Sequence, residues 1–415
     1  MNDTRRIVLK LLVRLENDSA FSNIILDNEL SNSKFSLQEK RFISAIFYGV
    51  AERKITLDSI INKYSKIKID KLDTNCLQIL RMGIYQLIYM DSVPESAAVN
   101  ESVKLAKRLK NPAISGFING ILRTFIRDGK KIPNSKNKSE QLSLEFSCPI
   151  WLVDKWLNEY GEDYTMSLLK SSLGKAPVTV RVNSIRKSVN EAIEILESDG
   201  VECEKTNFDN CIKISSTGAI DKTKAYNCGF IHVQDISSQL CCMALGAQSG
   251  ETVLDLCSAP GGKAFTIAQI MCNQGKLLAF DLHQKRVNLI QDGAERLGLS
   301  IIDAKTNNAK EFNPDIPMAD RILCDVPCSG LGVIRRKPEI KYKNPDDFKK
   351  LPEIQYSILK TASKYLKVGG TLVYSTCTVS KAENDDVISK FLFENLDFEG
   401  VQISSRYKEL SDYKA

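Results

Sequence analysis

The chain has 415 residues, of which 43% are hydrophobic and 26% are charged, and its formal net charge is +6 at pH 7. This length allows two or three domains with cores of their own, and the composition excludes a fibrous or disordered chain. No apolar run reaches the length of a membrane span, and the amino terminus lacks the cleavage pattern of a signal peptide.

The cysteine and histidine content narrows the chemistry further. Twelve cysteines without a secretion signal indicate thiols in a reducing compartment, so we expect a cytoplasmic protein without a disulfide framework. No Cys-x-x-Cys pair occurs, and His232 and His283 are the only histidines. These features argue against a metal site and against a histidine-based catalytic triad.

The first part of the chain is basic and helical in pattern. Residues 1–140 hold 24 Lys and Arg against 15 Asp and Glu, a net charge of +9, whereas the remainder is near neutral at −3. Apolar residues at helical spacing predict an all-α domain over 1–130, with helices near 6–15, 41–50, 73–90, 96–110 and 114–125. The charge favours a polyanionic partner such as nucleic acid. A solvated lysine-rich surface is the alternative.

A polar linker is expected at 131–140, followed by a small α+β module over 141–240. Its pattern predicts helices at 151–160 and 163–172, a strand at 178–183, a helix at 189–198 and short strands at 211–215 and 230–233.

Strands and helices alternate in the last part, 241–415, which predicts a doubly wound parallel sheet of the α/β class. The expected strands cover 252–256, 276–281, 300–304, 321–325 and 371–375. Ligands of such sheets bind beyond the carboxyl ends of the strands. Asp255, Asp281, Asp325 and Cys377 all lie at or just beyond those ends, so one crevice can gather them.

A glycine-rich turn follows the first of these strands. Gly261 and Gly262 allow close backbone approach, and the start of the next helix can bind a carboxylate or a phosphate. Asp281, at the end of the next strand, suits the two hydroxyls of a ribose. The dinucleotide and P-loop glycine patterns are absent, but a dinucleotide, a mononucleotide or a purely structural turn all remain open on this segment alone.

Two cysteines stand apart from the others. Cys328 follows a proline and precedes a Ser-Gly turn, and Cys377 ends an apolar strand, so both are expected to be reactive thiols. An isolated cysteine is usually a small buried hydrophobic residue. We expect that of Cys76, Cys203, Cys211, Cys241, Cys242, Cys257, Cys272 and Cys324.

Together, 255–263, Asp281, 325–330 and 375–378 resemble the motifs of the RNA 5-methylcytosine methyltransferases. Residues 1 to about 128 look like a NusB-type RNA-binding domain, and with 332–342 the chain is similar to the Sun/Fmu (RsmB-type) branch of that family, which methylates 16S ribosomal RNA. The resemblance implies three parts: a NusB-like helical domain, an RRM-like α+β module and a Rossmann-like methyltransferase domain.

The resemblance also implies the chemistry. The cofactor would be S-adenosylmethionine (SAM), the partner 16S ribosomal RNA, and the product a 5-methylcytosine at one position, conventionally numbered 967. A thiol would add to carbon 6 of the base so that carbon 5 can take the methyl group. The protein would act as a monomer without a membrane or a metal.

Residue roles follow from the same resemblance. Cys377 would be the nucleophile, Cys328 would assist release, Asp325 would hydrogen bond the base edge, and Lys263 would reach the same pocket. DNA cytosine methyltransferases use the Pro-Cys thiol instead, so Cys328 as nucleophile is the alternative. The cofactor-binding residues would be Leu256, Cys257, Ser258, Ala259, Pro260, Gly261, Gly262, Lys263, Asp281, Arg286, Asn308 and Asp325.

The chain departs from the family pattern at several places. Ala264, Val326 and Leu331 replace other residues, and Asn308 stands where an aspartate is usual. The last strand of the family's sheet is expected to be missing, which would leave an edge near 396–404 without a partner. Other RNA substrates (23S ribosomal RNA or transfer RNA), a DNA cytosine methyltransferase and a non-catalytic RNA-binding assembly factor are the rival interpretations.

Overall fold

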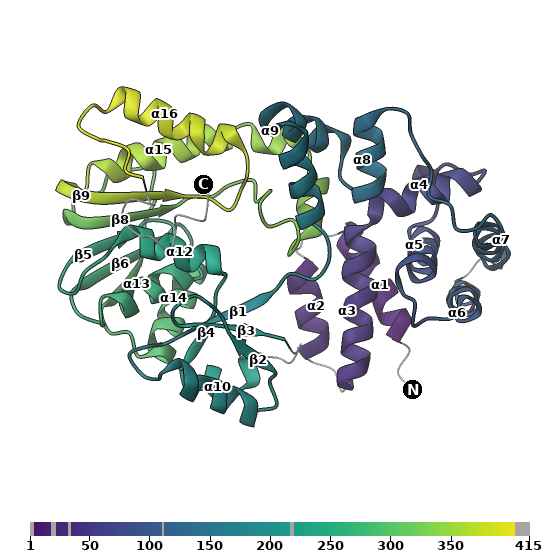
Figure 1. Cartoon of the computed structure of the whole chain (residues 1–415), viewed down its shortest axis with the longest axis horizontal. Helices are drawn as coiled ribbons and strands as arrows, with labels where there is room; N and C mark the ends of the chain where they lie inside the picture. Colours follow the sequence, from purple (N-terminus) through teal and green to yellow (C-terminus); the bar gives the residue numbers. More distant parts are fainter. Residues whose placement is uncertain (1–3, 18–21, 32–34, 110–111, 216–219, 403–415) are drawn as a thin grey trace. The chain divides into compact units, whose positions relative to one another are not determined.

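The computed structural model describes residues 4–17, 22–31, 35–109, 112–215 and 220–402. The chain forms two compact units (Figure 1). Unit 1 comprises Met1–Ala176 together with Leu331–Pro345, and unit 2 comprises Pro177–Gly330 together with Asp346–Ala415. The expected domain limits at 130, 140 and 240 remain predictions about which segments fold by themselves.

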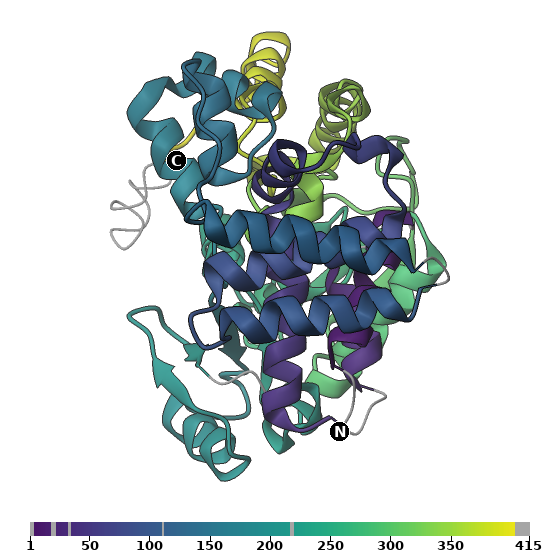
Figure 2. The same cartoon turned by 90° about the vertical axis from the view of Figure 1, so that its right-hand side faces the viewer.

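Unit 1 is helical (Figure 2). Its α-helices are α1 (Thr4–Asn17), α2 (Ser22–Ser31), α3 (Leu37–Glu52), α4 (Lys54–Tyr64), α5 (Thr74–Tyr89), α6 (Glu95–Lys107), α7 (Ala113–Arg127), α8 (Lys138–Phe146) and α9 (Ile150–Ser171). The short 3-10 helix η1 (Ile69–Lys71) lies between α4 and α5. All five helices expected before residue 128 are confirmed, although α6 ends at Lys107, and the expected end at Lys110 lies outside the described residues.

Local signals in the sequence fix where these helices begin and break. Ser36 and Glu39 form a reciprocal capping box at the start of α3. The Asp73 side chain accepts from the Cys76 N–H at the start of α5. The helix α9 breaks at Gly161, whose φ of 75° lies in the left-handed region, so the two expected helices on either side of it are confirmed.

The core of unit 1 surrounds α5, where buried residues follow one another from Cys76 to Ile84. Arg81 is only 3% exposed, and its charge is balanced inside the unit. Its Nε and Nη2 donate to Asp58 at 2.6 and 2.7 Å, and its Nη1 donates to Glu16 at 3.0 Å. A buried guanidinium needs such paired carboxylates, because a charge without a partner is strongly disfavoured in a core.

The segment Leu331–Pro345, which follows the Pro-Cys motif, belongs to unit 1. It carries the 3-10 helix η3 (Pro338–Tyr342). Both the Lys341 Nζ and the Tyr342 hydroxyl donate to the Glu52 carbonyl, at 2.9 and 3.0 Å. The Glu339 carboxylate accepts from the Ser22 N–H at the start of α2, at 3.0 Å. Unit 1 is therefore built from two stretches that are far apart in the sequence.

Unit 2 begins with an antiparallel four-stranded sheet in the order β2-β3-β1-β4. The elements are β1 (Val178–Val182), α10 (Val189–Ser198), β2 (Cys203–Lys205), β3 (Cys211–Ile214), η2 (Ile220–Lys222), α11 (Lys224–Asn227) and β4 (Ile231–Val233). This β-α-β-β-α-β order is the ferredoxin-like arrangement. The expected strands and helix are confirmed, and the three-residue β2 was not predicted.

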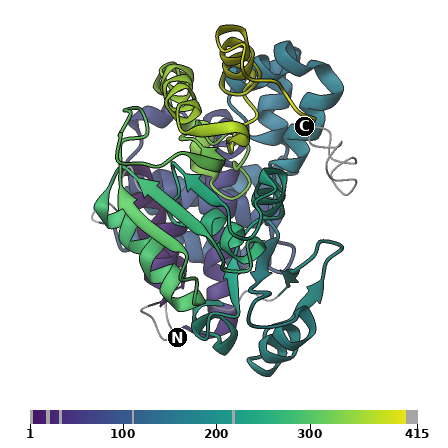
Figure 3. The same cartoon turned by 90° about the vertical axis from the view of Figure 1, so that its left-hand side faces the viewer.

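The rest of unit 2 is a parallel five-stranded sheet in the order β7-β6-β5-β8-β9 (Figure 3). Its strands are β5 (Thr252–Asp255), β6 (Lys276–Asp281), β7 (Ile302–Thr306), β8 (Ala319–Asp325) and β9 (Leu366–Ser375). The expected doubly wound sheet is confirmed. The strand expected at 300–304 begins two residues later, and the strand expected at 371–375 begins already at Leu366.

Helices cover both faces of this sheet. One face is covered by α12 (Ile236–Leu245), α13 (Gly262–Ile270) and α14 (Gln284–Leu297), the other by α15 (Leu351–Ser363), with α16 (Asp385–Glu394) packed beside it. Neighbouring strand residues alternate between the faces, so Val253 packs with the first set and Leu254 with the second. Two further 3-10 helices, η4 (Pro345–Phe348) and η5 (Lys381–Glu383), flank α15 and α16.

From β5 the chain builds the sheet in one direction, through β6 to β7, and then returns to the other side of β5 to add β8 and β9. The switch point of the sheet therefore lies between β5 and β8. Among the described residues, β9 pairs only with β8. The part of the expected unpaired edge beyond residue 402 lies outside the described residues, and the missing last strand remains a prediction.

Polar side chains join the antiparallel sheet to α13 within unit 2. The Gln234 Nε2 donates to the Gly262 carbonyl at 3.0 Å, and the Thr266 hydroxyl donates to the Gln234 Oε1 at 2.6 Å. His232 lies beside this pair and is 3% exposed. Burial, with the charges of Arg181 and Arg296, lowers the pKa of His232 to about 3. The ring is therefore neutral in the folded protein at neutral pH.

Candidate active site

The site lies at the carboxyl ends of four strands. Asp255 ends β5, Asp281 ends β6, Asp325 ends β8, and Ser375 ends β9 two residues before Cys377. The strands are parallel, so their ends meet at one edge of the sheet. The structure thus brings together the carboxylates and the thiol that the sequence predicted to share a crevice.

The glycine-rich turn connects β5 to α13. Its backbone is held by three hydrogen bonds, from the Leu256 N–H to the Leu323 carbonyl (3.1 Å), from Ser258 to Phe280 (2.7 Å) and from Gly261 to Ser258 (2.8 Å). Gly261 has a φ of +102°, and a Cβ there would approach the Phe265 ring to 2.5 Å. Only glycine fits at this position.

The same turn has the features of a ligand cradle. No side chain caps the start of α13, so its first N–H groups are available to an anion. A Cβ placed on Gly262 would meet no atom within 4 Å, so the space beside it is open. Both carboxylate oxygens of Asp255 and the Ser258 hydroxyl are buried and form no well-aligned hydrogen bond within the described part of the chain, although the Ser258 hydroxyl and the Cys257 N–H lie near the carboxylate.

Burial, together with the negative charge of Asp325, raises the pKa of Asp255 to about 7. Buried polar atoms without partners are unusual in folded proteins. Because three such atoms border an uncapped helix start and an open glycine, the turn fits a bound molecule that carries both hydrogen-bond donors and a negative charge.

Asp281 is held in place by Arg286. The Arg286 Nη1 lies 2.8 Å from the Asp281 Oδ2, and the Arg286 Nη2 donates to the Ala259 carbonyl at 2.9 Å. The His283 N–H donates to the other carboxylate oxygen at 3.2 Å. Arg286 thus connects the end of β6 to the glycine-rich turn, and both residues border the predicted cofactor site.

Asn308 lies just beyond Thr306, the last residue of β7, and is engaged in its own turn. Its Nδ2 donates to Glu311 at 2.5 Å, and its Oδ1 accepts from the Lys310 N–H at 3.2 Å. An aspartate could also accept from the Lys310 N–H, but only the amide of asparagine can donate to the Glu311 carboxylate. Its predicted contact with the cofactor remains a prediction.

The two predicted reactive thiols are neighbours. The Sγ atoms of Cys328 and Cys377 are 2.9 Å apart, and the Cys377 N–H donates to the Cys328 Sγ at 3.2 Å. Cys377 is exposed and Cys328 is half-buried. The hydrogen bond to Cys377, followed by burial, raises the pKa of Cys328 well above its usual value. Cys328 therefore keeps its proton at neutral pH.

Asp325 lies between a cation and a hydroxyl. The Lys263 Nζ donates to its Oδ2 at 2.7 Å, and the Ser375 hydroxyl donates to its Oδ1 at 2.7 Å. Burial by itself lowers the pKa of Lys263, but the Asp325 carboxylate and the nearby Cys241 outweigh it, so the pKa is raised. Lys263 thus remains an ammonium ion, which suits it to fix and balance Asp325 and not to act as a base.

Several residues near the thiols were not singled out from the sequence. Cys241, expected to be an ordinary core residue, adjoins Lys263, Ser375 and Asp325, and burial raises its pKa to about 11. Glu383 and Gln355 are buried beside the Cys328 loop.

For Cys272 the expectation of burial was wrong: it is exposed, at a left-handed position (φ 53°) just after α13, where the chain turns away from the core.

Within the described ranges, no cluster of three or more His, Cys, Asp or Glu side chains could hold a metal ion. No helix among the same residues is both long and apolar enough to cross a membrane.

Three family profiles match the chain in order. NusB family matches residues 2–127, the ferredoxin-like domain of RsmF/B-like methyltransferases matches 148–221, and 16S rRNA methyltransferase RsmB/F matches 242–414. The chain is 39% identical over 402 residues to the probable ribosomal RNA small subunit methyltransferase B of Bacillus subtilis, covering 95% of this chain and 89% of that protein. The chain belongs to the RsmB/F family.

Another relative and two solved structures are also similar to this chain. This RsmB/F chain is 33% identical to the corresponding probable methyltransferase B of Synechocystis, over 96% of the chain and 91% of that protein. The crystal structure of PH0851 matches with a TM-score of 0.80 and 26% identity, over 94% of this chain and 89% of that one. NSun6 from Pyrococcus horikoshii, solved with SFG, shares the fold with a TM-score of 0.55 and 19% identity, over 60% of this chain and 88% of that one.

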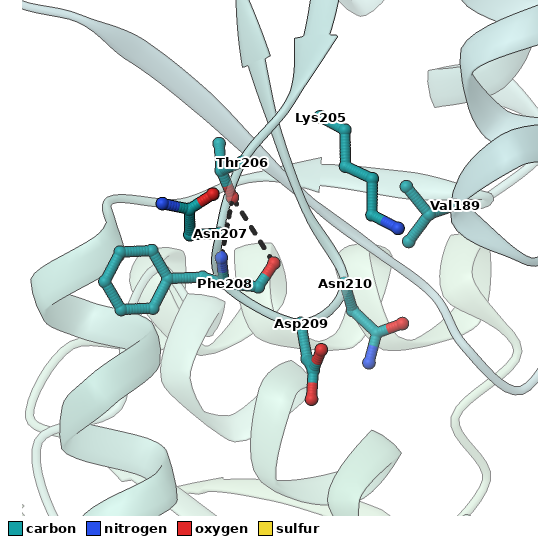
Figure 4. A pocket seen from close by; sticks show the side chains of 7 residues that line it. All are labelled: Val189, Lys205, Thr206, Asn207, Phe208, Asp209 and Asn210. Carbon is teal, nitrogen blue, oxygen red and sulfur yellow. Dashed lines mark hydrogen bonds between the residues drawn. The ribbon is translucent and has the colours of Figure 1, made fainter. Parts of the chain in front are cut away.

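The RsmB/F chain has a further hollow on its ferredoxin-like sheet (Figure 4). It is lined by Val189, by Lys205 at the end of β2, and by the β2–β3 connection, Thr206, Asn207, Phe208, Asp209 and Asn210. The Thr206 hydroxyl accepts from the Phe208 N–H at 3.2 Å, which folds the connection back on itself. This hollow shares no residue with the strand-end site and contains no thiol.

Proposed function

We propose that this protein transfers a methyl group from SAM to carbon 5 of a cytosine in 16S ribosomal RNA, through a covalent adduct between the base and Cys377. The observation that carries the proposal is the pair of thiols 2.9 Å apart, in the loops that follow β8 and β9. Two such thiols beside a glycine-rich turn suit a ring carbon that needs activation before it reacts. Membership of the RsmB/F family supports an RNA substrate.

Cys377 is the better nucleophile of the two. Its side chain is exposed, so it can reach a base that enters from solvent. A thiolate and not a thiol attacks an electrophile, and the raised pKa of Cys328 keeps that neighbour protonated. Addition of the Cys377 sulfur to carbon 6 leaves electron density on carbon 5, which can then form a bond to the methyl group.

Cys328 then assists release. After methylation, carbon 5 carries one proton too many, and its removal re-forms the ring double bond and expels the Cys377 sulfur as a thiolate. Cys328 can pass its own proton to the departing Cys377 sulfur, because the two sulfurs lie within hydrogen-bonding distance. The Cys328 thiolate that this leaves then takes the proton from carbon 5, so both sulfurs end as thiols.

Asp325 would bind the polar edge of the base. Its two oxygens are already oriented by Lys263 and by Ser375, so the carboxylate does not need to reorganise when the base gains charge. Groups fixed in advance toward a developing charge stabilise a transition state strongly. The ammonium of Lys263 balances the charge of the carboxylate and fixes one of its oxygens.

The turn 256–263 fits SAM. The uncapped start of α13 would bind its carboxylate, and the buried Asp255 and Ser258 would accept and donate the remaining hydrogen bonds. Asp281, fixed by Arg286, would accept from the ribose hydroxyls. When bound, SAM supplies an electrophilic methyl group. The relative NSun6 was solved with SFG, an analogue of SAM, which supports the same use here.

The RNA contact is assigned to unit 1. Residues 1–140, which include its NusB-type helices, carry a net charge of +9, whereas the remainder of the chain carries −3. Phosphate contacts of this kind supply affinity and position, and carry little sequence information. The target cytosine must leave its stack to reach the thiols. By the family resemblance, the target is the cytosine at position 967.

Bisulfite sequencing of ribosomal RNA tests the proposal directly. A strain lacking the protein should lose one unconverted cytosine in 16S ribosomal RNA, and a plasmid copy should restore it, whereas a Cys377→Ala copy should not. Loss of a methylated cytosine in 23S ribosomal RNA or transfer RNA instead would identify that RNA as the substrate. Unchanged methylation together with a defect in ribosome assembly would favour the non-catalytic interpretation.

A further inference from the structure

Glu383 connects the two loops that carry the reactive thiols. It lies at the end of η5 and is 3% exposed. Its Oε1 accepts from the Ser329 hydroxyl at 2.5 Å, and its Oε2 accepts from the Ser329 N–H at 2.9 Å and from the Gln355 Nε2 at 3.0 Å. Burying a carboxylate costs free energy unless hydrogen bonds compensate for the lost water, and here three donors do so beside the Cys328 loop. Such an arrangement indicates a specific role for Glu383.

We propose that Glu383 is a positioning residue that sets the placement of the Cys328 sulfur relative to the Cys377 sulfur. The consequence of this positioning for methylation rests on the proposed function. The effect of Glu383 on the distance between the two thiols does not.

On the Cys328 side, Glu383 fixes the residues before and after the thiol. Ser329, which follows Cys328, binds the carboxylate through both its backbone and its side chain. The Gln355 Nε2 donates to the Pro327 carbonyl at 2.9 Å as well as to Glu383. Pro327, which precedes Cys328, is thereby held through Gln355, a side chain that is fully buried on α15.

On the Cys377 side, the connection runs through hydroxyl groups. Because the Ser329 hydroxyl donates to Glu383, the Thr378 hydroxyl, 2.8 Å away, donates to Ser329. Thr378 follows Cys377 directly and in turn accepts from the Ser380 N–H at 3.2 Å. One unbroken series of hydrogen bonds therefore runs from the Cys377 loop through Ser329 to Glu383.

The neighbouring Asn384 completes the arrangement. Its Oδ1 accepts from the Thr376 hydroxyl at 2.6 Å, and its Nδ2 donates to the Thr378 carbonyl at 3.1 Å. The Tyr374 hydroxyl donates to the Glu383 carbonyl at 2.6 Å. The residues on both sides of Cys377 are thus fixed to the same short segment that holds the Cys328 loop.

This arrangement has a chemical purpose in the proposed reaction. One sulfur must reach carbon 6 while the other acts next to carbon 5 of the same ring. An error of about 1 Å in such a placement reduces a rate by about 100-fold. The two thiols lie on different loops, so a shared buried carboxylate is the direct way to hold them to one geometry.

The experiment measures the thiol pair itself, without RNA or SAM. The full-length protein is equilibrated with mixtures of reduced and oxidised glutathione. The two thiols give up two electrons and two protons as the Cys328–Cys377 disulfide forms, and the oxidised glutathione takes them up to become two reduced glutathiones. Peptide mass spectrometry measures the fraction of disulfide, which gives the effective concentration of one thiol at the other.

Glu383→Gln replaces one acceptor by an amide donor facing other donors, so we expect the effective concentration to fall by about tenfold or more. Glu394→Gln on α16 is the matched control, since Glu394 pairs with Tyr356 and Lys360 and does not touch either thiol loop. It should leave the value unchanged. An unchanged or higher value in Glu383→Gln would overturn the proposal.

A double-mutant cycle separates positioning from general loss of stability. Ser329→Ala should lower the effective concentration in the same direction, and the double variant should lose no more than Glu383→Gln alone. Independent, additive losses would contradict a shared role. If the wild-type protein forms the disulfide as expected but forms no adduct with RNA that contains 5-fluorocytidine, the methylation chemistry fails and the positioning role stands.

If wild-type adduct formation is seen, Glu383→Gln should slow it in single turnover while the dissociation constant for SAM stays within about twofold, because Glu383 does not contact the turn 256–263. A loss confined to SAM affinity would contradict the assignment.

Discussion

Lys263 and Asp325 form an ion pair of 2.7 Å that joins the first turn of α13 to the end of β8 across the switch point of the sheet. Lys263 ends the cofactor turn, and Asp325 begins the loop of Cys328. The pair therefore ties the predicted SAM site to the predicted base site. A substitution at either residue should change catalysis more than it changes binding of the cofactor.

Asp325→Asn keeps the size of the side chain and can still accept from Ser375, but it loses the charge that faces Lys263. We expect the single-turnover rate of methylation to fall by about 100-fold, the scale for losing one preorganised polar group. Asp320→Asn, at the other end of β8, is the control, since Asp320 pairs with Lys367 away from the strand-end site. Equal rates in the two variants would rule out a catalytic role for Asp325.

The two thiols should fail in different ways. Cys377→Ala should abolish methylation and leave RNA binding intact, because no sulfur can add to carbon 6. Cys328→Ala should accumulate a covalent protein–RNA adduct, because addition still occurs and release does not. A denaturing gel separates these outcomes. An adduct that accumulates in Cys377→Ala and not in Cys328→Ala would reverse the roles.

Asp281→Ala should weaken SAM binding by about 1–3 kcal/mol, the usual result of leaving buried polar groups unpaired. The substitution also removes the partner of the Arg286 guanidinium. Isothermal titration calorimetry measures the change. Asp303→Ala on β7 is the control, since Asp303 pairs with the neighbouring Lys305 and not with the turn. No change in affinity would remove the ribose role from Asp281.

Acid should loosen the contact between the antiparallel sheet and α13. The pKa of His232 is about 3 in the folded protein and near its model-peptide value of about 6.5 when unfolded. Between these values the unfolded state binds a proton that the folded state does not, so the free energy of unfolding falls as the pH falls. The slope is about 1.4 kcal/mol per pH unit, or about 2 kcal/mol between pH 6.5 and 5.

Hydrogen exchange followed by mass spectrometry on β1 and β4 peptides should show this loss of protection in the wild-type protein. His232→Gln cannot titrate and should lose about 2 kcal/mol less over the same range. The same pH dependence in both proteins would place its origin elsewhere in unit 2.

Unit 1 should supply much of the affinity for RNA. Lys66, Lys68 and Lys71 are exposed around η1 and suit phosphate contacts. Replacing all three with alanine should weaken binding at low salt and lower the slope of log affinity against log salt by about 0.7–0.9 for each phosphate that is no longer neutralised. The control replaces the exposed Lys222, Lys224 and Lys276 of unit 2. Equal reductions in affinity for both sets would assign recognition to unit 2 as well.

Much of the fold followed from periodicity. Helical spacing located α1, α3, α5, α6, α7 and α9 of unit 1 but not α2, α4 and α8, and short apolar runs located most strands of both sheets. The parallel order then placed Asp255, Asp281 and Asp325 together, because strand ends of this kind meet at one edge. The three-residue β2 is too short to show a pattern, and the first half of β9 contains Lys367 and two glycines, which gave no strand signal.

The supporting residues of the site could not be read from the sequence. Glu383 is separated from Ser329 by 54 positions and lies in a short 3-10 helix, where no periodicity marks a buried face. Cys241 looks like any core cysteine, because burial and proximity to Lys263 are properties of the packing and not of the local pattern. The membership of α8 and α9 in unit 1 likewise depends on long-range contacts.

The assignment of Leu331–Pro345 to unit 1 has a consequence for folding during synthesis on the ribosome. The amino-terminal helices emerge first, but the Glu52 carbonyl and the Ser22 N–H receive their partners only when Lys341, Tyr342 and Glu339 have been synthesised. By then four of the five strands of the parallel sheet, β5 to β8, have also been synthesised, and only β9 has not. The earliest part of the chain therefore waits for a late one, and vectorial synthesis completes the two units almost together.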